Sequence, residues 1–502
     1  MRTQNANLKL VRYALCTRIL TATFAAGLCL SAAVAQLSLP QIDPRQSPDQ
    51  RASANLPEQA GQSDPSSPAV DEQVETMLPH LSNTRFWLSG QANFISQGHP
   101  PFFAKYSGKN SFQSNFQDAT SRILTLYTGV RLNNSTEVLV DVEDASGFGM
   151  SNSLGLAGYT NLDVVRIPGE GSPLSTAPYL ARAMIHKVFA LSRDKVENER
   201  SALSLFDELP RRRLEIRFGK FDMVDFFDQN SVGSDTHFQF MNWTIDANGA
   251  YDYAADTRGY TVGVTAEYED QSWGLRFAEA LMPKIANGID LVYKPWQGMH
   301  ADNWEYELRR GFIPKKPGVL RLLAYTNYAN MGIYEQAVAQ FQEHLAPVPD
   351  ITNHPFRITR KYGCGINVEQ NLARHLTAFG RFGWNNGKTE SFVYTEVDQT
   401  FSAGLEAHGS MWHRRYDRAS IAFASNAISK AHQTYLADGG YGFLLGDGAL
   451  NYGRETILET YYTAHVWRGI YLGPDIQHIN NPGYNRDRGP VLVVGGRLHL
   501  EF

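Results

Sequence analysis

Cysteine is scarce in this chain of 502 residues. Two of its three cysteines, Cys16 and Cys29, lie among the first 35 residues, and only Cys364 lies beyond them. If that first segment is removed on export, a single cysteine remains and no intramolecular disulfide can form. This composition excludes a small secreted fold that depends on several disulfides.

Long apolar runs are also absent beyond the N-terminus. The 17-residue stretch ILTATFAAGLCLSAAVA follows four basic residues and ends at the small-x-small site Ala33-Val34-Ala35. This pattern is typical of a signal peptide, and we expect residues 1–35 to be cleaved before Gln36. No later run reaches the roughly 18 apolar residues that a membrane-spanning helix needs. An exported chain of this kind is either periplasmic or a barrel in an outer membrane.

An excess of positive charge is absent as well. The chain carries 46 basic and 51 acidic residues, and four basic residues leave with the signal, so the mature charge is −9. An acidic chain argues against nucleic acid as a partner. Residues 36–84 are rich in Pro, Ser, Gln and Asp, and such a segment buries too little apolar surface to fold. We expect a flexible periplasmic leader there.

Signatures of catalysis and of metal binding are missing too. The 14 histidines form no His-x-x-x-His motif and no i, i+2 pair, and no Gly-x-Ser-x-Gly is present. We therefore expect no metal, no cofactor and no catalytic residue. A glycan hydrolase stays open only as an alternative from a different class, because Asp252 and Asp256 could be taken for an acid pair.

From residue 85 onward the sequence alternates with period two. In RRLEIRFGK, Ile216 and Phe218 share one face while Glu215 and Arg217 share the other. About 13 such segments occur, many with Trp or Tyr near an end, and their polar faces repeat Arg and Glu. Free backbone groups are not tolerated in lipid, so such a sheet has to close on itself. We predict an all-β fold, a transmembrane antiparallel β-barrel of about 16 strands over residues 85–502.

The C-terminal sequence PVLVVGGRLHLEF fits the last strand of such a barrel. Its even positions, among them Leu492, Val494 and Phe502, are apolar, whereas Arg497 and His499 lie on the opposite face. We predict that this strand pairs with the first strand and turns its even face to lipid.

Three blocks of the sequence resemble the carbohydrate-selective porins of the OprB type. They are GFGMSNSLGLAGYTNLDVVR (147–166), the long block LPRRRLEIRFGKFDMVDFFDQNSVGSD through GYTVG (209–263), and residues 455–502. The resemblance implies a bacterial outer-membrane barrel of 16 strands that passes monosaccharides and related solutes, with a terminal Phe as its assembly signal. It implies small sugars as permeants and outer-membrane lipid around the wall. The same broad family includes members described as manganese-selective, so a divalent cation channel remains the alternative. Monomer and trimer both stay open.

Charged side chains supply the candidates for a pore constriction. A Gly-rich segment at 147–166 follows a predicted strand and either folds into the pore or forms an ordinary extracellular loop. Charges that alternate along strands either bind solutes in the lumen or form structural ion pairs; Arg276, Arg321, Arg381 and Arg497 could join them. The constriction candidates are Glu143, Asp144, Arg166, Arg213, Glu215, Arg217, Arg258, Glu305 and Arg309.

The stretch FMNWTIDANGAYDYAADTRGYTVG supplies the candidates for sugar contact. It combines aromatic rings with carboxylates and amides, which suit the apolar face and the hydroxyl groups of a sugar. The same aromatics would equally anchor a packed loop. The sugar-contact candidates are Trp243, Asp246, Asp252 and Asp256.

Overall fold

The computed structural model describes residues 74–81, 84–163, 177–393 and 396–502. Compact units comprise Met1–Asp71 and Glu72–Phe502, and the first lies outside the described residues. The expected signal peptide and most of the expected leader lie there as well. Within the described residues no helix is long and apolar enough to cross a membrane.

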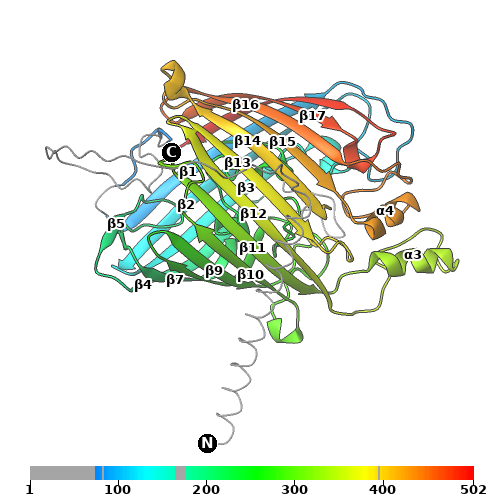
Figure 1. The fold of residues 1–502 in the computed structure, drawn as a ribbon, viewed down its shortest axis with the longest axis horizontal. Coiled ribbons are helices and arrows are strands. Elements are labelled where there is room, and N and C mark those ends of the chain that lie inside the picture. The colour runs from blue at the N-terminus through cyan, green and yellow to red at the C-terminus, as the bar shows by residue number, and fades with distance from the viewer. Residues whose placement is uncertain (1–73, 82–83, 164–176, 394–395) are drawn as a thin grey trace, which may run out of the picture. The chain divides into compact units, whose positions relative to one another are not determined.

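Sixteen described strands close into one antiparallel barrel, and two short strands form a separate hairpin (Figure 1). The barrel strands are β1 (Phe86–His99), β2 (Gln117–Asn133), β3 (Thr136–Gly147), β4 (Tyr179–Ala190), β7 (Arg213–Asp222), β8 (Tyr260–Glu269), β9 (Trp273–Ala280), β10 (His300–Leu308), β11 (Gly318–Ala329), β12 (Thr359–Ala373), β13 (Leu376–Asn385), β14 (Gln399–His408), β15 (Arg418–Ala427), β16 (Glu455–Trp467), β17 (Ile470–Asn480) and β18 (Val491–Glu501). The hairpin consists of β5 (Lys195–Glu197) and β6 (Glu208–Pro210).

Helices are few and short. The described α-helices are α2 (Trp243–Asp246), α3 (Tyr334–Gln342) and α4 (Lys430–Ala437). Short 3₁₀ segments are η1 (Met150–Ser153), η2 (Met223–Asp225), η3 (Pro295–Gln297), η4 (Gly409–Trp412) and η5 (Pro482–Tyr484). All of them lie in connections between strands, so the barrel wall itself is made of strands alone.

The barrel closes where its last strand meets its first. β18 pairs antiparallel with β1 from Gln91↔Glu501 to Gly98↔Val494. The closure satisfies the backbone groups that an open edge would leave without partners in lipid. The predicted all-β barrel, its 16 strands and the pairing of its end strands are confirmed.

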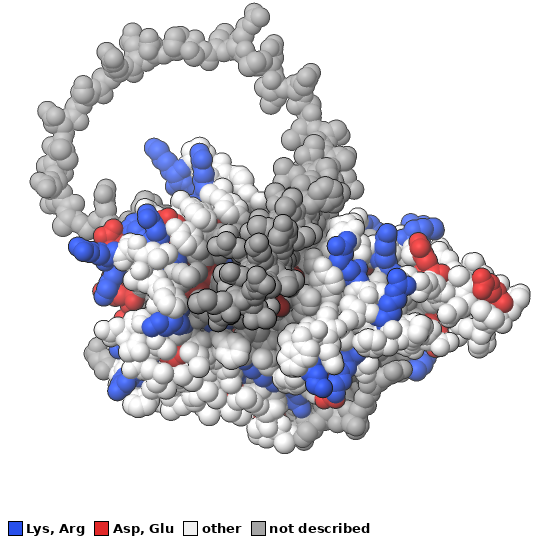
Figure 2. All heavy atoms as spheres, turned by 90° about the horizontal axis from the view of Figure 1, so that it is seen from below, with Lys and Arg blue, Asp and Glu red and all other residues white. Residues whose placement is uncertain are grey.

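Period-two alternation sets which side chains face outward. On β7, Phe218 is 62% exposed and its neighbour Arg217 is 6% exposed. On β18, Leu492 and Val494 are exposed while Val493 is buried. Most of the visible described surface in Figure 2 is uncharged. The apolar face of each strand is therefore the outer face, as the C-terminal sequence predicted.

Short and long connections lie at opposite ends of the barrel. Residues 134–135, 270–272, 374–375 and 468–469 make tight turns at one end, where His80 Nε2 also lies 3.2 Å from the carbonyl oxygen of Phe502. The opposite end carries the long connections, including the one that holds α3 and the one that holds α4 (Figure 1). Two of these long connections turn back into the barrel.

The crossing loop (residues 223–259) joins β7 to β8 and reaches several parts of the wall. Arg497 of β18 donates to the carbonyl oxygen of Gln239 at 2.7 Å, and Arg381 of β13 donates to that of Ile245 at 2.9 Å. The Tyr251 hydroxyl donates to Asn303 of β10 at 2.9 Å. Because these strands lie at different places around the barrel, the loop crosses its interior.

A companion loop (residues 148–163) follows β3 and packs on the crossing loop. The backbone N–H of Gly158 donates to Glu455 of β16 at 2.8 Å. A Cβ on Gly158 would lie 2.5 Å from Thr244 Oγ1 and 2.7 Å from Asn242 Oδ1, so only glycine permits this approach. Of the two alternatives for the Gly-rich segment, its described residues therefore take the infolded one.

An inserted segment (residues 191–212) between β4 and β7 enters the barrel from the short-turn end. The backbone N–H of Leu205 donates to Glu137 of β3 at 2.9 Å. His186 lies 2.7 Å from both Glu137 and Glu215 and joins three wall strands beside this contact. This element was not predicted from the sequence, because the segment has no marked periodicity of its own.

Candidate functional site

The infolded segments enclose a cavity of about 600 Å³ inside the barrel. The crossing loop supplies most of its lining, and the wall strands, the companion loop and Leu203 of the inserted segment supply the rest. Carboxylates outnumber guanidinium groups in this lining. The acidic members are Glu143, Asp163, Asp222, Asp225, Asp228, Asp235 and Asp246, and the arginines are Arg182, Arg258, Arg381 and Arg418.

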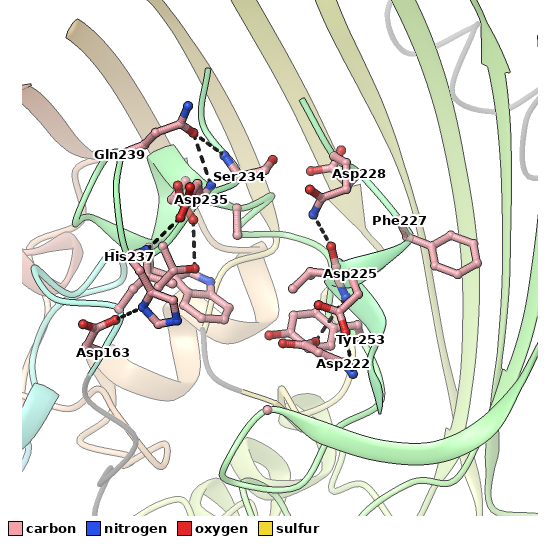
Figure 3. Close-up of a pocket in the computed structure, with 18 of the residues that line it drawn as sticks. Asp163, Asp222, Asp225, Phe227, Asp228, Ser234, Asp235, His237, Gln239 and Tyr253 are labelled. Atoms are coloured by element: carbon pink, nitrogen blue, oxygen red, sulfur yellow. Dashed lines mark hydrogen bonds and ion pairs between the residues drawn. The ribbon is translucent and has the colours of Figure 1, made fainter. Parts of the chain in front are cut away.

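The acids divide into groups on two sides of the cavity. Figure 3 shows Asp163 and Asp235 near His237 on one side and Asp222, Asp225 and Asp228 on the other. His237 Nδ1 lies 3.0 Å from Asp163 Oδ1. Burial lowers the pKa of His237, but the nearby Asp163 carboxylate outweighs it and the net shift is upward.

Local capping fixes the backbone of the crossing loop. Asp222 accepts from the N–H of Val224 at 3.1 Å and begins η2. Asn242 accepts from the N–H of Thr244 at 3.1 Å and begins α2. Asn and Asp are favoured at such positions because their side chains satisfy free helix N–H groups. These caps orient Asp225 and Asp246 toward the cavity that both line.

Arg381 is the main fixed point of the crossing loop inside the barrel. Its Nη1 donates to the carbonyl oxygens of Ile245 and Asp246, each at 2.9 Å. Its Nη2 donates to the carbonyl oxygen of Asp228 at 2.9 Å and to Ser234 at 2.6 Å. Its Nε forms an ion pair with Asp228 Oδ2 at 2.8 Å. The guanidinium is therefore fully engaged by the loop that it holds.

The other cavity arginines are engaged as well. Arg182 makes two contacts with Asp225, at 2.5 and 2.7 Å. Arg418 lies 3.3 Å from Glu406, and Arg258 stacks 3.7 Å from the centre of the Tyr179 ring. Each cationic group thus already has an anion or an aromatic ring beside it.

Asp246 differs from these paired groups. Its Oδ2 accepts from Thr236 Oγ1 at 3.3 Å, but its Oδ1 has no hydrogen-bond donor among the described residues. The residue is 4% exposed. Burial is the main cause that raises the pKa of Asp246 to about 7, with Asp235 adding to the rise and Arg381 and Arg497 opposing it.

A second group of charges lies on the inner wall from β7 to β11, and we call it the ladder. Arg276 lies at its centre, within 2.5 Å of Glu267, 2.8 Å of Glu305 and 2.9 Å of Glu307. Neighbouring pairs continue this pattern across the sheet. The ladder consists of Arg213, Glu215, Arg217, Glu267, Glu269, Arg276, Glu305, Glu307, Arg309 and Arg321.

The sequence-based candidates fall into distinct places. Glu143, Trp243, Asp246 and Arg258 line the cavity. The candidates on the ladder are Arg213, Glu215, Arg217, Glu305 and Arg309. Strand register brings these ladder residues together, because Glu215 lies opposite Glu267, which is itself opposite Arg276.

Four candidates lie elsewhere. Asp144 faces outward, because it lies two residues after the outward-facing Val142 on the same strand. Its Oδ1 lies 3.4 Å from Nη2 of Arg122. Asp252 pairs with Lys361 at 3.2 Å, and Asp256 accepts from the N–H of Arg258 at 2.8 Å, so both stabilise loop structure. Arg166 lies outside the described residues.

Sequence reasoning missed the run of acids that follows β7. Asp225, Asp228 and Asp235 line the cavity but were not among the candidates. The signal that could have found them is the density of Asp in FDMVDFFDQNSVGSD, directly after a predicted strand. In the described part of the chain no group of three or more His, Cys, Asp or Glu could hold a metal ion.

Comparisons with known proteins agree with this architecture. A family model described as "Carbohydrate-selective porin, OprB family" matches residues 119–502. A high-pH structure of Pseudomonas putida OprB is similar with a TM-score of 0.60 at 16% identity, covering 83% of this chain and 94% of that one. The outer membrane channel DcaP of Acinetobacter baumannii has a TM-score of 0.43 at 9% identity, covering 83% and 97%. No curated protein sequence matches the chain. At these identities the structural likeness shows the fold alone.

Proposed function

The chain belongs to the OprB family of carbohydrate-selective porins, and we propose that it is a passive diffusion channel for monosaccharides with a charged lumen. Family and fold indicate a channel of the bacterial outer membrane rather than an enzyme. Beyond family membership, we propose that the sugars are monosaccharides and that side chains of the cavity contact them. Small sugars are the permeants, and outer-membrane lipid contacts the apolar outer wall.

The single observation that carries the proposal is the lining of the cavity. Trp243 and Tyr253 both line it, and their rings stack with centroids 6.2 Å apart and planes at 15°. An aromatic face suits the C–H face of a pyranose, while carboxylates and guanidinium groups suit its hydroxyls. A cavity of about 600 Å³ accommodates a solute of this size.

The infolded loops give the channel its selectivity in this proposal. The crossing loop is held to the wall by Arg381 and Arg497, so it narrows the passage as a fixed element. Solutes then pass between the crossing loop and the paired charges of the cavity. The ladder, which is buried and paired, supports the wall beside this path and contributes to the transverse field.

Planar-bilayer recordings of the purified full chain test the proposal. Glucose should reduce the single-channel current in a saturable way. Trp243→Ala should weaken this block by about fivefold, equivalent to about 1 kcal/mol of lost ring stacking. Trp273→Ala is the matched control, because Trp273 lies on an outward-facing strand position and should leave the block unchanged. A current indifferent to every monosaccharide would exclude a sugar-selective channel.

A divalent cation channel is the second candidate, and the acid excess of the cavity favours it. Seven carboxylates line the cavity beside four arginines. Manganese uptake by a porin-deficient strain expressing this chain separates the two candidates. Uptake that rises with manganese while added glucose has no effect on the current would favour the cation channel.

A further inference from the structure

Two carboxylates of the cavity, Asp235 and Asp246, form no direct ion pair with a described side chain. Asp246 lines the cavity, is more than nine-tenths buried, and leaves its Oδ1 without a donor. Asp235 lines the same cavity from an exposed position and forms no ion pair with any described residue. The two are close neighbours, since Thr236, next to Asp235, donates to Asp246. A buried carboxylate oxygen without a donor is costly, so Asp246 Oδ1 is placed to accept from a cationic group of a solute in the cavity.

Arg381, whose charge acts on Asp246, directs its donors to other groups. Arg381 directs its Nη1 to the backbone carbonyl of Asp246 and not to its carboxylate. Its remaining donors contact Asp228, Ser234 and Ile245. Arg381 thus holds the backbone of the crossing loop and does not contact the carboxylates of Asp235 and Asp246. These carboxylates therefore remain available to a solute.

The surroundings favour an organic ammonium over a metal ion. In the described part of the chain no three acidic, histidine or cysteine side chains converge to hold a metal. Trp243 precedes Asp246 on the same short helix and lines the same cavity. A ring beside a carboxylate pair matches a solute that carries both a sugar ring and an ammonium group.

We propose that the channel favours amino sugars over neutral sugars, with the sugar ammonium held by Asp235 and Asp246 and the ring lying against Trp243. This inference rests on the proposed function and deepens it by naming the solute class. Permeation involves no bond making, so the ammonium enters and leaves with its proton.

A series of three sugars that differ only at carbon 6 tests the inference. The probes are 6-amino-6-deoxyglucose, glucose and glucuronate, applied to the full chain in planar bilayers at about pH 8, where an alkyl ammonium keeps its proton. The aminosugar should block the current at a concentration about tenfold lower than glucose, equivalent to about 1.4 kcal/mol, and glucuronate should be the weakest. Methylammonium chloride, which has the charge but no ring, should not block at these concentrations.

Two variants and one control assign the effect to the pair. Asp246→Asn and Asp235→Asn should each lower the preference for the aminosugar over glucose from about tenfold to close to one, measured as the ratio of the two blocking concentrations. Asp290→Asn removes the same charge from an exposed residue paired with Lys284 and should keep the full preference. Heat-dependent gel mobility and the conductance in plain salt establish that each variant is folded.

The outcomes separate the inference from the function on which it rests. Block by glucose with no preference for the aminosugar overturns the inference and leaves the sugar channel standing. Equal block by methylammonium, or a preference that survives both Asp variants, also overturns it. No block by any of the three sugars removes the proposed function itself.

Discussion

The ladder and the cavity contain the same types of side chain, but they differ in how the charges are paired. In the ladder each carboxylate lies against guanidinium groups, as at Arg276, which contacts four glutamates. In the cavity neither Asp235 nor Asp246 forms a direct ion pair with a described arginine, and Asp246 Oδ1 has no donor among the described residues. The difference shows that an inward-facing charge is not by itself a solute contact. A charge becomes available to a solute only where the neighbouring cations are otherwise engaged.

Backbone geometry explains the contrast. Strand register places ladder residues at regular spacing, so each acid on one strand lies opposite a position on the next, as Glu305 does with Arg276. The crossing loop has no such regular neighbour. Its carboxylates are positioned by helix N-caps and by Arg381, which donates mainly to backbone carbonyl oxygens. Four experiments test this contrast.

The largest effect is expected at the centre of the ladder. Arg276→Ala leaves four buried glutamates without their shared cation and should lower the free energy of unfolding by about 3–5 kcal/mol. Urea unfolding of the barrel in detergent or lipid measures it. Lys284→Ala, which breaks an exposed pair with Asp290, should change the same quantity by less than about 1 kcal/mol. Equal effects of the two variants would show that the ladder is not a buried network.

The next largest effect separates the two faces of one strand. Ile216 lies on the face that Phe218 exposes, one residue from the inward Arg217. Ile216→Arg should cost about 2–4 kcal/mol near the midplane of the membrane. Ile216→Leu is the control and should unfold as wild type does. A barrel that tolerates arginine at this position would contradict the assignment of the outer face.

Proton binding to Asp246 should change the ion selectivity of the cavity. It should not change the stability that the ladder gives to the barrel wall. The pKa of Asp246 is raised to about 7, mainly by burial, with Asp235 adding to the rise and Arg381 and Arg497 opposing it. Deprotonation between about pH 6 and about pH 8 should therefore raise the permeability ratio of K⁺ to Cl⁻ by roughly twofold. The sign of the selectivity change follows from the charge, because a deprotonated Asp246 attracts K⁺ and repels Cl⁻. Because the pKa is raised, the protonated form stabilises the folded loop, and that contribution is lost as pH rises through about 7.

Reversal potentials in a KCl gradient measure this pH dependence. In Asp246→Asn the ratio should stay level over the same range, because the titrating carboxyl is gone. A wild-type ratio that does not change with pH would mean that Asp246 is either always charged or never in contact with the ion path.

The smallest effect is expected outside the barrel. Asp144 forms an exposed pair with Arg122 on the outer face. Asp144→Asn should change the unfolding free energy by about 0–1 kcal/mol and leave conductance and sugar block unaltered. Any shift in ion selectivity would place Asp144 back among the constriction residues.

Much of the wall was predictable, and much of the cavity was not. Alternation assigned Arg217 and Glu305 to the inner face and Phe218 to the outer face, because a strand turns successive side chains to opposite sides. Glu143 and Asp144 show where the same reasoning fails: adjacent residues on one strand were both taken for the constriction, yet only Glu143 lines the cavity. Asp252 and Asp256 lie in the crossing loop but do not line the cavity, because Asp252 pairs with Lys361 and Asp256 accepts from the N–H of Arg258.

The sequence by itself determined the barrel, because a two-residue rhythm allows one apolar and one polar face, and the absence of water in lipid forces the sheet to close. It also determined which side chains point inward on each strand. Only the tertiary structure decided which inward charges are neutralised and which remain open. That choice depends on contacts between residues far apart in the chain, such as Arg381 with Asp246 and Arg497 with Thr236, that no local pattern encodes.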